Sequence, residues 1–241
     1  MSVQPIRAIV TDIEGTATSI AFVRDSLFPY ARRRLGEYLA AHREDEAVLR
    51  IIADARALAG DDTLDDQAVI DLLIGWSDAD RKITPLKALQ GLIWTQGFRD
   101  GELVGDVYDD AARSFREWHE AGYRLHVYSS GSILAQKLVF GHTPHGDLAT
   151  LFSGFFDTTT GPKLEADSYR AITAALGLEP GEILFLSDSI GELDAAREAG
   201  LATIALDRGE AVIPPGQTHP VAKTFDAIDP ATGTVAAQAG S

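Results

Sequence analysis

The chain has 241 residues, enough for one large α/β domain or for a core domain with a smaller second unit. Its 36 acidic and 21 basic residues give a formal net charge of −15, which opposes binding to nucleic acids and to anionic membranes. The absence of cysteine excludes disulfides, thiolate catalysis and Cys-based zinc sites. The apolar run in the first ten residues is too short for a signal peptide or a membrane span, so we expect a soluble, cytoplasmic protein.

The predicted elements fall into two regions. A short strand is predicted at 6–11, and a long stretch without a convincing strand follows it. Apolar residues at helical spacing predict helices there, at 22–42, 46–60, 66–76, 85–97 and 110–122. After Gly122, strands are predicted at 124–129, 154–158, 182–187 and 202–206, alternating with helices at 132–140, 165–177 and 191–200.

This alternation is typical of a parallel sheet covered by helices on both faces. We therefore predict an α/β fold with a Rossmann-like core, formed by residues 1–17 and 119–228, and an inserted α-helical domain at 18–118. Residues 229–241 are small and polar and are predicted to be a disordered tail. Ligands of such a sheet bind beyond the carboxyl ends of its strands.

Several predicted strands end in side chains suited to phosphate chemistry. Parallel neighbouring strands would bring these ends together at one site. The candidate residues are Asp12 and Glu14 after the first strand, Ser129, Ser130 and Gly131 after the second, Lys163 before a helix, and Asp188 with Glu192 after the fourth.

A carboxylate that attacks phosphorus is repelled by the charge of the phosphate. A magnesium ion held by Asp12 and Asp188 would offset that charge, and Lys163 would add a fixed cation. Two carboxylates in different environments hold different protonation states. We therefore predict that Asp12 attacks to form an aspartyl phosphate, while Glu14 protonates the leaving oxygen and later activates water.

The segments "DIEGT", "YSSGS", Lys163 and "SDSIGELDA" resemble the four motifs of the haloacid dehalogenase superfamily, whose members are mostly Mg²⁺-dependent phosphotransfer enzymes. Glu14 departs from the Asp that superfamily phosphatases most often have there. Longer segments, "DIEGTATSIAFVRDSLFPYA" and "TPLKALQGLIWTQGFRDGELVGDVYDDA", are similar to the enolase-phosphatase (acireductone synthase) family of methionine salvage. This resemblance runs from about Ile9 to Ala205 and includes the insertion.

The resemblance implies a substrate, 2,3-diketo-5-methylthiopentyl-1-phosphate, that is first enolised and then hydrolysed to acireductone and phosphate. It also implies a monomer whose helical insertion caps the site and which binds one Mg²⁺ per chain. The spacing does not identify the base for enolisation. The implied site residues are Asp12, Glu14 and Asp188 for the metal (Glu14 through its side chain or its carbonyl), Ser129, Ser130 and Lys163 for the substrate, and Gly131 and Glu192 in support.

Two other functions fit part of the pattern. The first is a capped phosphatase of the same superfamily that acts on another small phosphate ester. The second is a phospho-accepting signalling domain, which also places Asp, Ser or Thr, and Lys around Mg²⁺; a helical insertion directly after the first strand argues against it. His142 and His145 have spacing compatible with a metal site, but a loop role is favoured because no third ligand is evident.

Overall fold

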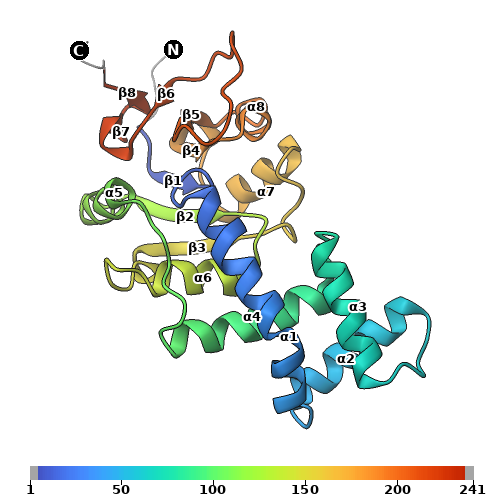
Figure 1. Ribbon diagram of the computed structural model, residues 1–241. Helices are drawn as coiled ribbons and strands as arrows, with labels where there is room; N and C mark the ends of the chain where they lie inside the picture. Colours follow the sequence, from blue (N-terminus) through green and yellow to red (C-terminus); the bar gives the residue numbers. More distant parts are fainter. Residues whose placement is uncertain (1–4, 237–241) are drawn as a thin grey trace. The chain divides into compact units, whose positions relative to one another are not determined.

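The computed structural model describes residues 5–236 of the chain. Six strands form a parallel sheet in the order β3-β2-β1-β4-β5-β6 (Figure 1). Their bounds are β1 Ala8–Thr11, β2 Arg124–Tyr128, β3 Phe152–Phe156, β4 Ile183–Ser187, β5 Ala202–Leu206 and β6 Val221–Ala222.

The strand order reverses direction at β1, which pairs with β2 on one side and with β4 on the other. Thr11 is level with Val127 and with Leu186, so these three strands end side by side. A reversal of this kind leaves a crevice at the carboxyl ends of the strands, where α/β proteins bind their ligands. The predicted Rossmann-like α/β fold is confirmed.

The chain divides into two compact units, which we call the core unit (Met1–Ile20 with Gly105–Ser241) and the helical insertion (Ala21–Val104). The core unit contains α5 Asp109–Glu120, α6 Ile133–Gly141, α7 Ala166–Leu176, α8 Ile190–Glu198 and the short turns η2 Ala149–Leu151, η3 Pro180–Glu182 and η4 Phe225–Ala227. The insertion contains the π-helical turn η1 Phe22–Leu27 and helices α1 Phe28–Ala41, α2 Glu46–Ala59, α3 Asp66–Asp78 and α4 Thr84–Arg99.

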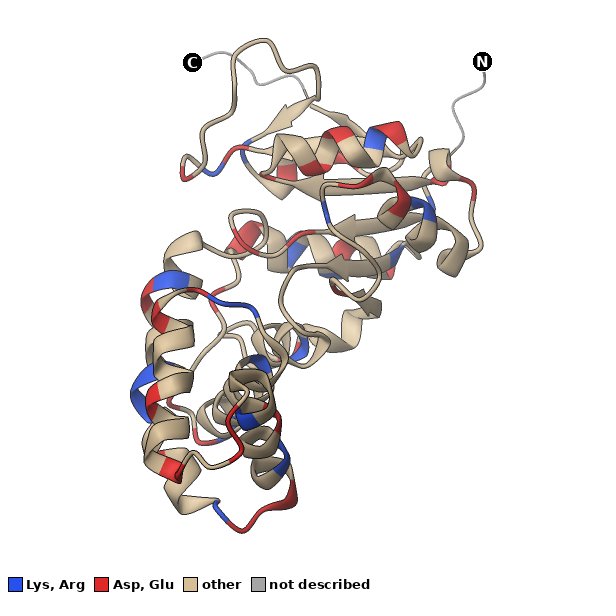
Figure 2. Ribbon diagram, turned by 90° about the vertical axis from the view of Figure 1, so that its right-hand side faces the viewer, with Lys and Arg blue, Asp and Glu red and all other residues tan. Residues whose placement is uncertain are grey.

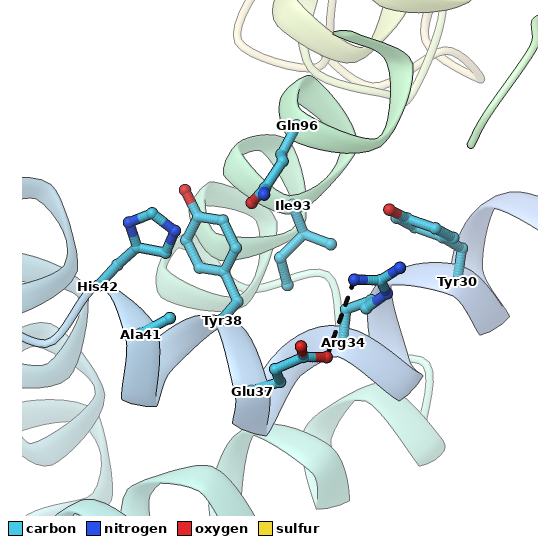
Figure 3. A pocket seen from close by; sticks show the side chains of 8 residues that line it. All are labelled: Tyr30, Arg34, Glu37, Tyr38, Ala41, His42, Ile93 and Gln96. Atoms are coloured by element: carbon cyan, nitrogen blue, oxygen red, sulfur yellow. Dashed lines mark ion pairs between the residues drawn. The ribbon is translucent and has the colours of Figure 1, made fainter. Parts of the chain in front are cut away.

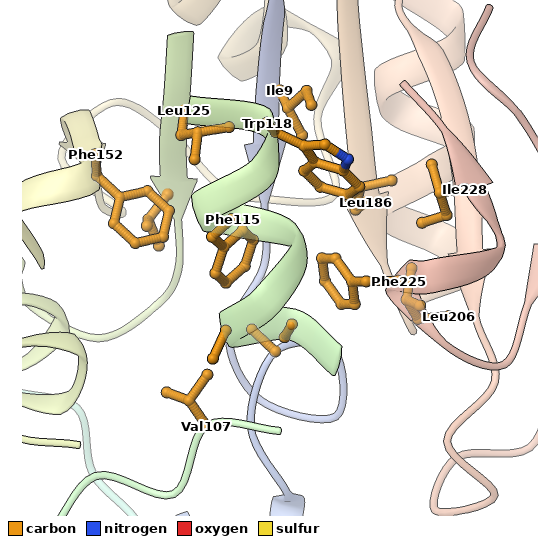
Figure 4. Packing of buried hydrophobic residues seen from close by; sticks show 14 of the residues in the cluster. Ile9, Val107, Phe115, Trp118, Leu125, Phe152, Leu186, Leu206, Phe225 and Ile228 are labelled. Atoms are coloured by element: carbon orange, nitrogen blue, oxygen red, sulfur yellow. The ribbon is translucent and has the colours of Figure 1, made fainter. Parts of the chain in front are cut away.

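The boundaries of the insertion differ from the predicted 18–118. Helix α5 belongs to the core unit because its apolar face packs on the sheet: Phe115 and Trp118 are buried against sheet residues. Figure 4 shows Phe115 at the centre of this packing, among Leu125, Phe152 and Phe225.

The sheet is apolar on both faces because successive strand residues point to opposite sides. On β1, Ile9 joins the cluster around Phe115, whereas Ala8 and Val10 join a second cluster with Tyr169 of α7. This explains why the central strands β1 and β4 are nearly continuous apolar runs rather than alternating ones.

Within the helical insertion, α1 and α4 hold each other through an aromatic contact. Phe28 meets Trp94 edge to face with ring centroids 5.6 Å apart, and Trp94 Nε1 donates to the carbonyl of Leu27 at 2.9 Å. The side chain of Asp65 caps α3 by accepting the N–H of Ala68 at 2.8 Å.

Part of the predicted disordered tail is ordered. Strand β7 Ile228–Asp229 pairs with β8 Thr234–Val235, and the turn between them is held by Asp229, whose carboxylate accepts the hydroxyl of Thr232 at 2.7 Å. The small polar residues of this segment are turn-forming residues. The remainder of the predicted tail, 237–241, lies outside the described residues.

Charged residues of both signs are interspersed along the helices (Figure 2). Within residues 5–236, no helix combines the length and the apolar character needed to cross a bilayer.

His126 on β2 gives folding a dependence on pH. The side chain is buried, and within the described part of the chain neither ring nitrogen has a hydrogen-bond partner. Burial and then the Arg124 charge lower the pKa of His126 to about 4, whereas an exposed histidine titrates near 6.5. As the pH falls from 6.5 toward 4, the unfolded chain therefore gains a proton that the folded chain does not, and stability falls.

We expect His126→Leu to remove this dependence. Between pH 7.5 and pH 5, the free energy of unfolding should fall by about 2 kcal/mol less in the variant than in the parent protein. Urea denaturation at the two pH values measures the difference, with the more exposed His42→Gln as control. Equal losses in His126→Leu and the parent would contradict the assignment.

Candidate active site

A tight turn follows β1 and carries the two acidic residues. The carbonyl of Ile13 accepts the N–H groups of Ala17 and Thr18, both at 2.8 Å, which closes the turn. Gly15 has φ +74°, and a Cβ placed on it would lie 2.3 Å from Asp188 Oδ2. Glycine is therefore required both by its backbone conformation and by the close approach of Asp188.

Lys163 links two carboxylates in the same place. Its Nζ lies 2.6 Å from Asp12 Oδ1 and 2.6 Å from Glu192 Oε2, and only 10 % of its side chain is exposed. Burial alone lowers the pKa of a lysine, but the charges of Asp12 and Glu192 outweigh it, so the pKa of Lys163 is raised. Lys163 is therefore a fixed positive charge.

The carboxylates outnumber this cation, and their crowding changes their protonation. Burial, followed by the charge of Asp12, raises the pKa of Asp188 to about 6. The same two causes raise the pKa of Glu192 to about 7, although Lys163 and a hydrogen bond of 3.0 Å from Ser187 Oγ oppose the shift. The excess of buried negative charge marks a place that a cation would stabilise.

Ser129 stands at the end of β2, where its N–H donates to the carbonyl of Phe156 at 3.2 Å. Gly131 donates its N–H to Ser129 Oγ at 3.2 Å, and its carbonyl accepts from Gln136 Nε2 at 2.8 Å. Gly131 thus holds the Ser129 hydroxyl oxygen in place.

These residues surround one cavity of about 220 Å³ in the core unit. All the predicted site residues except Gly131 line it, together with one apolar residue that was not predicted, Ile20. The lining residues are Asp12, Glu14, Ile20, Ser129, Ser130, Lys163, Asp188 and Glu192.

Carboxylate oxygens are the donors that Mg²⁺ prefers, and one or two of them are enough because this ion keeps several water ligands. Asp12 and Asp188 meet that requirement in the shared cavity. Among residues 5–236, however, no group of three or more His, Asp or Glu side chains is arranged to hold a metal. This finding concerns side chains, so the expected contribution of Glu14 through its carbonyl stays a prediction.

The comparisons with known proteins agree with this geometry. The family model of haloacid dehalogenase-like hydrolases matches residues 6–200. Proteins called enolase-phosphatase E1 from Thioalkalivibrio sulfidiphilus (strain HL-EbGR7) and Methylococcus capsulatus are 56 % and 55 % identical to this chain. The alignments cover 92 % and 93 % of this chain and 98 % of each relative. The chain belongs to the enolase-phosphatase family of haloacid dehalogenase-like hydrolases.

A solved structure extends the likeness to three dimensions. The UTR4 protein of Saccharomyces cerevisiae is 33 % identical, has a TM-score of 0.79, and is matched over 92 % of this chain and 100 % of its own. The predicted family and the prediction of a phosphatase enzyme are confirmed.

Thr16 and Ile20 are parts of the site that were not predicted from the sequence. Thr16 is the last residue of "DIEGT", and its Oγ1 accepts the N–H of Asp188 at 2.9 Å. The feature of the sequence that could have identified Thr16 is its hydroxyl group, which closely follows the acidic pair Asp12 and Glu14. Ile20 had no such feature, because an apolar residue at the start of a helical run carries no sign of a binding role, and it falls within the predicted insertion 18–118.

The helical insertion of this enolase-phosphatase has a pocket of its own (Figure 3). Its charged groups are mutually compensated: Arg34 lies 3.8 Å from Glu37 and also pairs with Glu102, while His42 Nδ1 lies 2.8 Å from Asp45. The lining residues are Tyr30, Arg34, Glu37, Tyr38, Ala41, His42, Ile93 and Gln96.

The two histidines with metal-like spacing make contacts within the core unit. His142 Nδ1 lies 3.1 Å from the carbonyl of Leu138, and His145 Nε2 lies 3.2 Å from the carbonyl of Val107. These contacts agree with the loop role favoured by the sequence.

Proposed function

We propose that the protein converts 2,3-diketo-5-methylthiopentyl-1-phosphate to acireductone (1,2-dihydroxy-3-keto-5-methylthiopentene) and phosphate, in the salvage of L-methionine. The observation that carries the proposal is the meeting of Asp12, Lys163 and Asp188 around one cavity. The names and near full-length match of the relatives support the enolase step.

In the phosphatase step, an Asp12 carboxylate oxygen attacks phosphorus and the bond from phosphorus to the ester oxygen breaks. Glu14 gives its proton to the departing oxygen. Glu14 then takes a proton from water, the water oxygen attacks phosphorus, and the bond to Asp12 breaks, which restores the Asp12 carboxylate and protonated Glu14. Lys163 and the hydroxyl of Ser129 stabilise the phosphoryl oxygens during both attacks.

We propose Mg²⁺ as the cofactor, held by the side chains of Asp12 and Asp188. When bound, it supplies positive charge to the phosphoryl group and to the oxygen of the forming enolate. The excess of acidic groups around Lys163 supports a cation here. With Asp12 and Asp188 as the side-chain ligands of the metal, the side chain of Glu14 is available for proton transfer.

Glu14→Gln tests that role. The amide cannot donate or accept the required proton, so we expect phosphate release to slow roughly a hundredfold. Rapid-quench measurement should also find more of the aspartyl phosphate, since its hydrolysis needs the same group. Glu117→Gln, which changes an exposed acid on α5, is the matched control. Unchanged rates in Glu14→Gln would assign proton transfer to another group.

The substrate is tested by supplying the diketone phosphate with Mg²⁺ and following inorganic phosphate and the oxygen-sensitive enediol. Both products should form, with the enol of the phosphate ester appearing first. A panel of small sugar and acid phosphates separates this proposal from the alternative of a different capped phosphatase. A preferred substrate without a diketone would favour the alternative.

Three further features remain predictions from the resemblance. They are a cytoplasmic location, a monomeric state and a capping role for the helical insertion. Sedimentation equilibrium measures the second directly.

A further inference from the structure

The loop that follows β5 carries two charged side chains that reach toward the active cavity without lining it. It consists of residues 207–210, with the sequence DRGE. It turns sharply: Gly209 has φ +77° and donates its N–H to Asp207 Oδ1 at 3.1 Å. Arg208 and Glu210 then bond to the segments that follow β1 and precede α5.

Arg208 holds the turn after β1. Its side chain is 6 % exposed, and Nε donates to the carbonyl of Thr16 at 3.0 Å. Nη1 donates to Asp110 Oδ2 at 2.9 Å, and the guanidinium lies 4.3 Å from the centroid of the Tyr108 ring. Because Thr16 Oγ1 accepts the N–H of Asp188, two hydrogen bonds connect Arg208 to the main chain of a proposed metal ligand.

Glu210 holds the wall of the same cavity. Its Oε2 accepts the N–H of Ile20 at 2.6 Å, and its Oε1 accepts the hydroxyl of Tyr108 at 2.8 Å. Tyr108 in turn donates its N–H to the carbonyl of Ala17 at 3.1 Å. One carboxylate thus fixes the main chain at Ile20, the apolar residue that lines the cavity.

We propose that Arg208 and Glu210 are positioning residues of the active cavity: Arg208 fixes the turn after β1 against Asp188, and Glu210 fixes the apolar wall at Ile20. Charge-assisted hydrogen bonds of this kind are strong and directional, and catalytic groups must be held within a fraction of an ångström. The chemistry attributed to the cavity rests on the proposed function. The two charged side chains act through Thr16 and Ile20 and do not touch the substrate.

A purely structural role would make different predictions. In that case the two residues would only fasten the loop after β5 to the rest of the core unit. Their loss would then lower the melting temperature and leave the binding of Mg²⁺ and substrate by the folded protein unchanged. Binding measurements therefore separate the two roles.

Arg208→Lys is the first test. Lysine keeps the charge but lacks the planar guanidinium group, so it cannot donate to Thr16 and to Asp110 at the same time. We expect isothermal titration to find Mg²⁺ binding weakened roughly tenfold. Arg113→Lys is the matched control, because Arg113 makes an exposed pair with Asp226 in the same unit and should leave Mg²⁺ affinity unchanged.

Thr16→Val provides a second route to the same link. It removes the hydroxyl that accepts from Asp188 while keeping the shape of the side chain, so it tests the connection even where Arg208→Lys fails to fold. We expect a similar loss of Mg²⁺ affinity. Mg²⁺ affinity within twofold of the parent in a folded variant would overturn the role of Arg208.

Glu210→Gln tests the role of Glu210 at the apolar wall of the cavity. The amide has only one oxygen to accept with, so it cannot serve both Ile20 and Tyr108. We expect KM for the diketone phosphate to rise roughly fivefold with little change in kcat, as for a lost binding contact. Tyr108→Phe keeps the bond to Ile20 and should leave KM unchanged; equal effects in the two variants would overturn the role of Glu210.

These outcomes are distinct from failure of the proposed function. An enzyme that released no phosphate from the diketone phosphate would refute that function. The Mg²⁺ titrations would still decide the role of Arg208, and KM for p-nitrophenyl phosphate would decide the role of Glu210.

Discussion

Replacement of Asp12 by Asn is expected to abolish phosphate release from a protein that remains folded. The amide has the size of the carboxylate and can still accept from Lys163 Nζ, which lies 2.6 Å from Asp12 Oδ1. It cannot attack phosphorus, so no aspartyl phosphate forms. Loss of a covalent nucleophile should lower the rate of phosphate release on the order of a thousandfold or more.

Enolisation should survive this change in part, because forming the enol requires no attack at phosphorus. Phosphate assays and the ultraviolet absorbance of the enol measure the two steps separately. Asp109→Asn, which removes an exposed acid from the core unit, is the matched control and should keep full activity. Substantial phosphate release by Asp12→Asn would refute the nucleophile assignment.

The strands and the groups at their ends could be predicted from sequence because both depend on local pattern. The runs that became β1 and β4 are apolar up to their last residue, and each is followed directly by a polar turn. Parallel pairing then places Asp12 and Asp188 at one edge without any knowledge of loops. The fold and the main acidic residues follow from that rule.

The contacts that refine the site could not be predicted, because they are tertiary contacts. Lys163 reaches Asp12 since its loop is held by a hydrogen bond of 2.8 Å from the Tyr169 hydroxyl to the Lys163 carbonyl. Arg208 lies in an irregular segment and Ile20 at the start of a helical run, and the hydrogen-bond partners of both are remote in sequence. The hydrophobic periodicity of a sequence gives no information about such contacts.

The compact helical unit differs from the predicted insertion for a related reason. Helix α5 has the same apolar spacing as the helices of the insertion, so periodicity alone does not tell what its apolar face covers. The packing of Phe115 on the sheet shows that α5 belongs to the core unit.

Lys163→Met is expected to cost both activity and stability, through the same lost charge. The variant leaves Asp12 and Glu192 close together, with only 8 % and 13 % of their side chains exposed and without the cation they share. Breaking a buried ion pair by removing one partner destabilises a protein by about 3 to 5 kcal/mol. Loss of a fixed charge at the phosphoryl group should also lower kcat/KM by a factor on the order of a thousand.

The destabilisation should depend on pH in a defined direction. With Lys163 present, the pKa of Glu192 is already raised to about 7, and without that opposing charge it rises further. Protonation relieves the repulsion between the two acids, so the variant should lose the most stability above neutral pH and less as the pH falls. Urea denaturation from pH 6 to pH 8.5 measures this trend, with the exposed Lys137→Met on α6 as control.

A double variant separates the two effects of the lost charge. Adding Glu192→Gln to Lys163→Met removes one of the two repelling acids, so we expect it to recover about half or more of the lost stability. It restores no positive charge near the phosphoryl oxygens, so phosphate release should stay low. Recovery of activity together with stability would show that Lys163 serves only to hold the two carboxylates, and the phosphate-binding role assigned to it would then be wrong.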